Sequence, residues 1–120
     1  MIRKLEINGV KMDVGADLQK YVIRKIGKLD KYLPRKSRES VHVEVYLKEK
    51  KIKTRKECVC EVIMKLPQET IAVSESTMNM FAAVDIVEAK LKNQIKKYKE
   101  THTSLKLHRR VINKFNRTPR

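Results

Sequence analysis

The amino-acid sequence predicts an α+β fold, a two-layer sandwich in which two helices cover one face of a four-stranded sheet. Two segments repeat apolar residues at spacings of three and four, which is the period of one helix face. Other segments alternate apolar and polar residues, as strands with one buried face do. The order is β-α-β-β-β-α, and two one-sided helices bury their apolar stripes only if both pack on the same face of the sheet.

The first predicted strand is short and covers residues 3–7. Leu5 and Ile7 are two positions apart, so their side chains point to the same face of the strand. The dipeptide Asn8-Gly9 follows at once, and such dipeptides mark turns. We therefore expect the strand to end before Asn8.

The first predicted helix covers residues 17–33. Asp13 is the expected N-terminal cap, and Pro34 is expected to stop the helix. The apolar stripe that faces the sheet consists of Leu18, Val22, Ile26, Leu29 and Leu33. The rest of the helix surface is basic, and its cationic residues are Lys20, Arg24, Lys25, Lys28 and Lys31.

Three further strands complete the predicted sheet. The inward side chains of the second strand are Val41, Val43, Val45 and Leu47. Those of the third strand are Cys58, Cys60, Val62 and Met64. The basic connection between these strands, residues 48–56, has a length that fits an extended hairpin. A turn at Pro67 to Glu69 leads into the fourth strand, in which Ile71 and Val73 face inward.

The second predicted helix follows the fourth strand, with Ser76 or Thr77 as its cap and an end near Glu100. Its apolar stripe consists of Phe81, Val84, Val87, Leu91, Ile95 and Tyr98. We therefore expect one domain at residues 1–100. Residues 101–120 contain several lysines and arginines and no acidic residue, so we expect a basic tail or linker there.

The charge of the chain predicts a polyanionic partner. Lysine and arginine number 29 against 14 acidic residues, which gives a formal net charge of +15. Such an excess repels itself unless an anion binds. No apolar stretch approaches the ~20 residues that span a bilayer, and the first residues lack the apolar run of a signal peptide. These features favour nucleic acid over a membrane and predict a cytoplasmic protein.

The sequence offers little for catalysis or for cofactor binding. Glu44 and Glu61 are expected near each other on neighbouring strands, but on the solvated face of the sheet, where nothing separates their pKa values into an acid and a base. His42 is expected on the same face. The three glycines form no phosphate-binding loop. We expect no enzyme, no cofactor and no small-molecule substrate.

The two cysteines are expected to be reduced residues of the core. Cys58 and Cys60 share one face of a strand, a placement that does not suit a disulfide between them. The histidines show no spacing that would complete a metal site with this pair. We therefore predict no metal site.

Rows of basic residues are the most informative feature of both helices. Arg24, Lys28 and Lys31 follow one another at four and three residues, and Lys90 and Lys97 flank Gln94 in the second helix. Like charges at this spacing repel each other and cost helix stability, so the rows favour a surface that binds an anion. Helix-turn-helix and zinc-finger signatures are missing from the sequence, and aromatic residues are few. Folded RNA, recognised through phosphates and shape, is the expected partner.

Segments of both helices carry a family resemblance. The first helix contains Tyr21-Val22-x-x-Lys25-x-x-Lys28-Leu29-x-Lys31-Tyr32. The second opens with Met80-Phe81-Ala82-Ala83-Val84-Asp85 and continues with Lys90-Leu91-x-x-Gln94-Ile95-x-Lys97. In their order and spacing, over about residues 1–100, these segments resemble the ribosome hibernation promoting factors and the ribosome-associated translation inhibitors of the sigma-54 modulation protein family.

The resemblance implies a function. It implies a domain similar to double-stranded RNA-binding domains that docks on 16S rRNA of the small ribosomal subunit, in the channel for messenger and transfer RNA. Translation would then be blocked during starvation or stationary phase. The positions that match the family's rRNA contacts are Lys25, Lys28, Lys31, Lys90, Gln94 and Lys97. Arg24 joins this set through its place in the first row.

Three positions depart from the family pattern. Asn93 stands where many relatives have arginine, which removes one phosphate contact unless Lys92 or Lys96 replaces it. Asn79 stands where an acid is common. Phe81 replaces a tyrosine, and we expect its ring in the core.

Long members of the family continue through a linker into a C-terminal domain that pairs two ribosomes. The chain is expected to be either a short member or the N-terminal part of a long one, with residues 101–120 as the start of the linker. Alone it is expected to be a monomer, and a dimer is expected only if a C-terminal domain is missing here. Two other hypotheses stay open, a general RNA-binding module or RNA chaperone and a regulator that binds an acidic protein.

Overall fold

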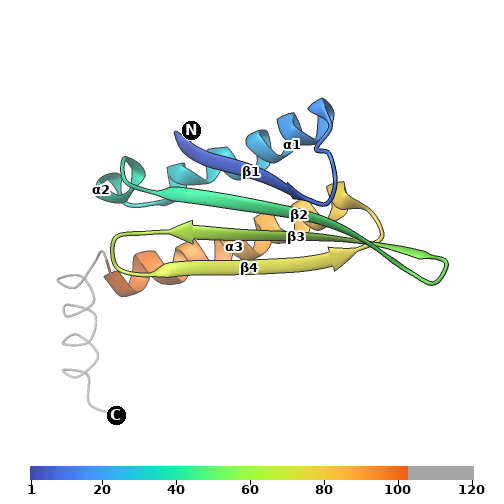
Figure 1. The fold of residues 1–120 in the computed structure, drawn as a ribbon. Helices are drawn as coiled ribbons and strands as arrows, with labels where there is room; N and C mark the ends of the chain where they lie inside the picture. The colour runs from blue at the N-terminus through green and yellow to red at the C-terminus, as the bar shows by residue number, and fades with distance from the viewer. Residues whose placement is uncertain (103–120) are drawn as a thin grey trace, which may run out of the picture.

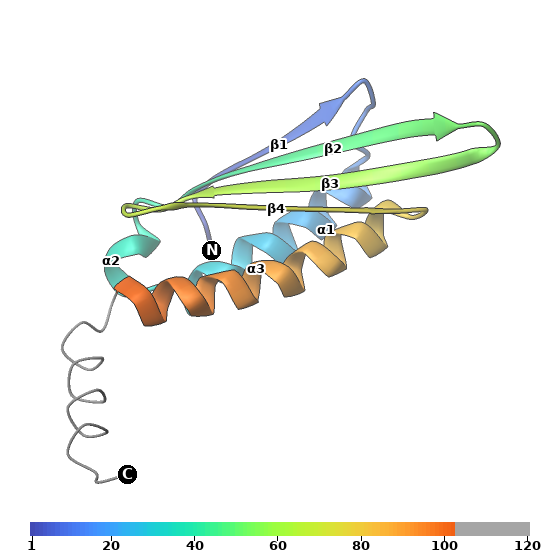
Figure 2. The same ribbon diagram turned by 90° about the horizontal axis from the view of Figure 1, so that it is seen from below.

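The structure is a computed structural model that describes residues 1–102. Its elements are β1 (Lys4–Val10), α1 (Ala16–Gly27), the 3-10 helix η1 (Lys28–Tyr32), α2 (Arg35–Arg38), β2 (His42–Ile52), β3 (Arg55–Lys65), β4 (Thr70–Thr77) and α3 (Met80–His102). Figures 1 and 2 show α1 and α3 on one face of the sheet, with the other face open. The predicted α+β sandwich is confirmed. Residues 101 and 102 of the predicted tail belong to α3, and the rest of that tail lies outside the described residues.

The strand order in the sheet is β1-β2-β3-β4. β1 runs parallel to β2, whereas β2 with β3 and β3 with β4 are antiparallel. A parallel neighbour needs a crossover connection, and α1, η1 and α2 form it. This crossover places α1 on the face that α3 also covers (Figure 2).

The core lies between the sheet and the two long helices. The fully buried strand residues alternate as predicted, and they include Val43, Val45, Leu47, Cys60, Val62 and Met64. The helices bury Val22, Ile26, Leu91 and Ile95 against them. Val43 and Cys60 have exposed fractions of 0%, which confirms that the helices cover this face. Apolar burial of this extent is the main stabilising contribution.

The predicted end of the first strand is wrong. β1 continues through Asn8 and Gly9 to Val10, and Gly9 pairs with Leu47 of β2. A Cβ atom at Gly9 would lie 2.3 Å from the carbonyl oxygen of Met12, so the glycine permits a close approach of the backbone within the strand. The chain turns later, where Lys11 has a φ of 57°.

The first helix is shorter than predicted. α1 ends at Gly27, and η1 continues in the tighter 3-10 geometry while keeping Leu29 buried. Asp13 is not the cap, because Gly15 holds that position without a side-chain hydrogen bond. Pro34 ends the segment as predicted and begins the short helix α2, which the sequence pattern did not indicate.

The cap of the second helix also differs from the predicted one. Asn79 Oδ1 accepts a 2.9 Å hydrogen bond from the backbone N–H of Phe81, and Ser76 and Thr77 belong to β4. Phe81 is 40% exposed, so its predicted place in the core is wrong. Its ring instead meets the Tyr21 ring edge to face, with 5.0 Å between the centroids.

Candidate RNA-binding surface

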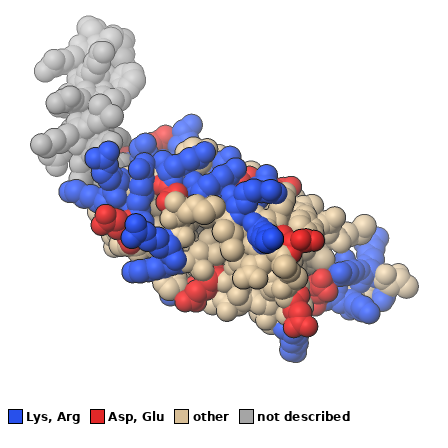
Figure 3. All heavy atoms as spheres, turned by 90° about the horizontal axis from the view of Figure 1, so that it is seen from above, with Lys and Arg blue, Asp and Glu red and all other residues tan. Residues whose placement is uncertain are grey.

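The basic residues predicted in the first helix lie on the helical side of the molecule. Arg24 and Lys25 are in the last turn of α1, and Lys28 and Lys31 are in η1. These positions border the buried stripe, so their side chains are exposed or half-buried. Figure 3 shows lysine and arginine gathered along this side of the molecule.

Lys25 and Lys28 have acidic partners on α3. Lys25 Nζ lies 3.7 Å from Asp85 Oδ1, and Lys28 Nζ lies 3.6 Å from Glu88 Oε2. Glu88 is 9% exposed and its Oε2 atom accepts no hydrogen bond, which makes Lys28 important for balancing its charge. The sequence could not reveal these pairs, because they depend on which faces of α1 and α3 meet.

Arg24 and Lys31, the other basic residues of this region, lie over aromatic rings. The Arg24 guanidinium carbon lies 5.3 Å from the Tyr21 ring centroid, and Lys31 Nζ lies 5.1 Å from that of Tyr32. Lys92 of α3 approaches Tyr32 from the other helix, at 5.6 Å. These distances suit cation–π attraction. Lys31 and Lys92, from two different elements, therefore approach the same ring.

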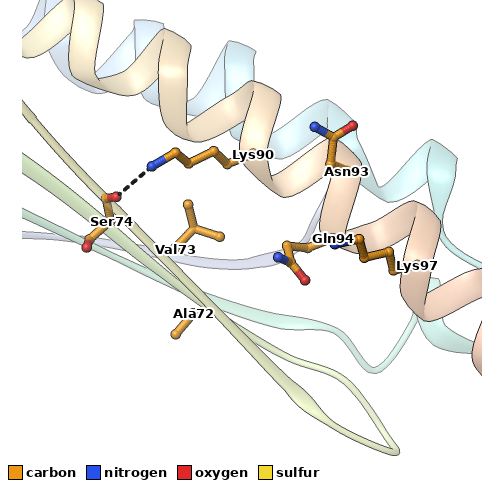
Figure 4. Close-up of a pocket in the computed structure, with 7 residues that line it drawn as sticks. All are labelled: Ala72, Val73, Ser74, Lys90, Asn93, Gln94 and Lys97. Carbon is orange, nitrogen blue, oxygen red and sulfur yellow. Dashed lines mark hydrogen bonds between the residues drawn. The ribbon is translucent and has the colours of Figure 1, made fainter.

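The predicted α3 row lies along the edge next to β4. Lys90, Gln94 and Lys97 line a hollow of about 440 Å³, together with Asn93 and the β4 residues Ala72, Val73 and Ser74. Figure 4 shows Lys90 pointing at Ser74, whose carbonyl oxygen accepts a 3.5 Å hydrogen bond from Nζ. Lys90 also pairs with Glu75, and this hydrogen bond is the main cause that lowers the pKa of that carboxyl.

The two rows flank α3 rather than forming one continuous patch. The α1 and η1 row faces Asp85, Glu88 and Lys92, while the α3 row faces β4. Exposed residues between the rows, Ile86, Ala89, Asn93 and Lys96, form the solvent side of α3. A helix with its side chains is only about 10–12 Å wide, so one extended polyanion could contact both rows.

Glu44 and Glu61 do not lie directly opposite each other on the open face of the sheet. Glu44 pairs in register with Ile63, and Glu61 pairs with Tyr46, so the two glutamates are diagonal neighbours. Glu44 accepts hydrogen bonds from Tyr46 OH and Lys65 Nζ, and these bonds lower the pKa of its carboxyl. The Glu44 side chain is only 17% exposed, so this part of the open face is half-buried and less solvated than predicted.

The structure brings three potential metal ligands together on this face, a grouping that the sequence did not indicate. His42 Nε2 lies 3.7 Å from a carboxylate oxygen of Glu6 and of Glu44. The three ligand atoms lie within 4.8 Å of one another. Because β1 pairs with β2 in parallel, Glu6 falls opposite Glu44, and this register could not be predicted from the spacing.

The cysteines are free and buried, as predicted. Burial raises the pKa of the Cys60 thiol from 9.0 to about 12, so the thiolate form is suppressed at neutral pH. Neither nucleophilic nor metal-binding chemistry is favoured at this thiol. Among the residues that the structure describes, no helix is both long and apolar enough to cross a membrane.

Comparison with known proteins identifies relatives of the chain. Residues 5–103 match the family described as "Sigma 54 modulation protein / S30EA ribosomal protein". The chain is 33% identical over 96 residues to a ribosome hibernation promotion factor of Lactococcus lactis subsp. cremoris, covering 80% of the chain and 49% of the relative. It is 30% identical over 99 residues to a factor of the same name from Staphylococcus aureus, covering 82% and 49%. The chain thus spans about half the length of these relatives.

Solved structures share the fold. The N-terminal domain of Thermus thermophilus Protein Y superimposes with a TM-score of 0.66 at 22% identity, covering 78% of this chain and 94% of that one. A ribosomal subunit interface protein from Coxiella burnetii gives a TM-score of 0.65 at 23% identity, covering 79% and 96%. The match of the family model over most of the sequence settles the assignment: the chain belongs to the sigma 54 modulation protein / S30EA ribosomal protein family.

Proposed function

We propose that the chain is a ribosome hibernation factor that binds 16S rRNA of the small ribosomal subunit in the channel for messenger and transfer RNA. Bound there, it inhibits translation during starvation or stationary phase by occupying the channel, without catalysing a reaction. The observation that carries this proposal is the pair of basic rows beside α3, in a chain of a family whose relatives are named ribosome hibernation promotion factors.

The pairing of the basic residues in the free protein is compatible with RNA binding. Lys25 and Lys90 pair with Asp85 and Glu75, and the lysine side chains are partly exposed. Exposed ion pairs are worth only about 0–1 kcal/mol. Phosphates release condensed counterions when lysines neutralise them, and this release is the larger favourable contribution. The lysines can therefore exchange carboxylate partners for phosphates.

Charge reversal at Lys31 and Lys97 tests the proposal with one residue from each row. Neither makes an ion pair with another described residue, whereas reversal of Lys28 would place a second negative charge beside the buried Glu88. We expect Lys31→Glu/Lys97→Glu to weaken binding to purified small subunits and to relieve inhibition of translation in vitro. The slope of log affinity against log salt should fall by about 1 for each phosphate that the variant no longer binds.

The matched control is Lys4→Glu/Lys36→Glu, which makes the same change in net charge at exposed positions of β1 and α2. Both double variants should melt like the wild type, because exposed substitutions usually change stability by less than about 0.5 kcal/mol. If the two variants bind small subunits with equal affinity, the helical side is not the rRNA site. If an excess of free RNA abolishes the binding of the wild type to small subunits, a general RNA chaperone is favoured instead.

A further inference from the structure

We propose that the tip of the β2–β3 hairpin is a second RNA-binding element, separate from the helical side, that binds an unpaired segment of an RNA strand. The identity of that strand as rRNA rests on the proposed function. The hairpin tip is defined as residues 49–57, and Figure 1 shows it extending beyond the ends of β1 and β4.

The hairpin tip is a ribbon of two strands without support from the rest of the sheet. β1 pairs with β2 as far as Lys48, and β4 pairs with β3 only from Cys58 onward. Beyond these points the two strands pair only with each other, up to a two-residue turn in which Lys53 has a φ of 57°. All residues from 49 to 56 are exposed. The ribbon therefore adds nothing to the hydrophobic core.

The charges of the ribbon make it less stable still. The hairpin tip contains five basic residues and two acids, Glu49 and Glu57, and Glu57 lies opposite Lys50 in the register. The basic residues are Lys50, Lys51, Lys53, Arg55 and Lys56. Lys51 lies opposite Lys56 in the register, and like charges in that position are destabilising. Glu49 compensates one of them, through an ion pair of 3.1 Å with Lys56 that raises the pKa of this lysine.

A two-stranded ribbon is only marginally stable in water. The positive charge of the ribbon does not stabilise the fold. Binding of an anionic partner is therefore the better explanation for it.

An apolar hollow at the base of the ribbon favours an unpaired nucleotide as the ligand. Ile52 is 52% exposed and Met78, which follows β4, is 75% exposed. Both line a hollow of about 310 Å³ together with Arg55, Lys56, Glu57, Ser76 and Thr77. An apolar wall can pack against the face of a base, while Arg55 and Lys56 at its border can contact the phosphates. Unpaired RNA offers both groups at once, whereas a base inside a duplex is not free to enter.

The hairpin tip is distant from the helical rows. Figure 3 shows a separate group of lysine and arginine at the right-hand end of the molecule, where Figure 1 places the hairpin tip. The row of Lys90, Gln94 and Lys97 lies along α3 instead. Contacts at sites that share no partners contribute additively, so the hairpin and the helical side can be tested independently.

The first experiment reverses charge at Lys51 and Arg55, neither of which pairs with an acid among the described residues. Lys51→Glu faces Lys56, and Arg55→Glu faces Ile52, so neither new carboxylate lies directly opposite an acid. We expect affinity for small subunits to fall roughly tenfold or more, and the salt slope to fall by ~0.7 for each single-strand phosphate that is no longer bound. Lys4→Glu/Lys36→Glu is again the control. Affinity equal to that of the control would overturn the proposal.

The second experiment removes the apolar wall with Ile52→Ser and Met78→Ser and uses a short poly(U) oligonucleotide as the probe. We expect weaker binding of poly(U) with an unchanged salt slope, because every basic residue stays in place, and unchanged binding of an RNA duplex. Equally weakened binding of both probes would contradict a pocket for an unpaired base.

The same probe separates this proposal from the proposed function. If the wild type ignores small subunits but binds poly(U) through Lys51 and Arg55, the ribosomal function fails and the hairpin site stands. If Lys31→Glu/Lys97→Glu abolishes binding to subunits while the hairpin variant binds both subunits and poly(U) normally, the hairpin site fails and the ribosomal function stands.

Discussion

Individual basic side chains on the helical side meet different surroundings, although the sequence presents them as equivalent. Lys28 balances the charge of the buried Glu88, whereas Lys31 and Lys92 lie over the Tyr32 ring. Removal of Lys28 would leave the buried carboxylate of Glu88 without this partner, which is expected to lower stability. Weaker RNA binding by a Lys28 variant would therefore have two causes, a less stable fold and the loss of one cation. A Lys31 variant tests the loss of a cation alone.

A pH-dependent stability is predicted for the buried Cys60. Its pKa is raised to about 12 by burial, so the folded protein holds the thiol proton at a pH where the unfolded chain has released it. The contribution to stability is therefore complete below about pH 9 and is lost between pH 9 and 12. Cys60→Ala lacks this group. We expect urea unfolding to show that the stability difference between wild type and variant shrinks as pH rises above 9, and a constant difference would contradict it.

At the scale of elements, alternation and helical period predicted the existence of most elements and their buried faces correctly, but not their ends. The alternation of apolar and polar residues correctly predicted Val43 and Cys60 in the core, because a strand with one buried face needs an apolar residue at every second position. Gly9 looked like a turn because nothing in the local pattern reveals that Met12 folds back against it. The short helix α2 has too few residues to show a period.

The candidate site was predictable only in part, for a related reason. Rows of like charge are visible along one helix, so the basic residues of α1 and α3 could be named. Their partners could not, because Asp85 and Glu88 reach Lys25 and Lys28 from another element. Phe81 was misplaced for the same reason, since the contact of α1 with α3 puts its ring against Tyr21 at the edge of the interface.

The side chain of Asn79 is predicted to stabilise the N-terminus of α3. Asn79 Oδ1 accepts the N–H of Phe81, and Asn79 also donates its own N–H to Thr77 Oγ1 at 3.1 Å. Loss of a capping side chain typically costs about 1 kcal/mol. We expect Asn79→Ala to lower the melting temperature, while Asn93→Ala, at an exposed position inside α3, should leave it unchanged or slightly raised, since alanine is the better helix former. Equal melting of the two variants would show that the cap contributes nothing.

For the whole molecule, the sheet acts as a frame that holds two basic regions at fixed positions. The helical rows depend on α1 and α3 packing against β2 and β3, and the hairpin tip is an extension of the same two strands. Because β2 and β3 continue into the hairpin tip without a break, the twist of the sheet sets the direction in which the tip extends. An RNA whose phosphates lie opposite both the helical rows and the hairpin tip would be recognised by its shape. Such recognition needs no base-specific contact to the helices.

The apolar surface of the described residues and the charge of the chain predict its oligomeric state. The stripes of α1 and α3 are used in the core. The exposed large apolar residues among the described ones come from several different parts of the fold, and they are Met1, Ile23, Tyr32, Ile52, Met78, Phe81 and Ile86. Stable interfaces bury about 800 Å² per partner. The net charge of +15 adds repulsion between two copies. We therefore expect light scattering to give a monomer at low micromolar concentration, also at raised salt, where charge repulsion is screened.

A stable dimer would contradict this prediction. The matched variant then replaces Val111, Ile112 and Phe115, which lie outside the described residues, with serine. A dimer that disappears in this variant places the interface in residues 101–120, whereas a dimer that persists places it on the folded domain. A monomer would fit the proposed function in the form in which one copy of the chain occupies one small subunit.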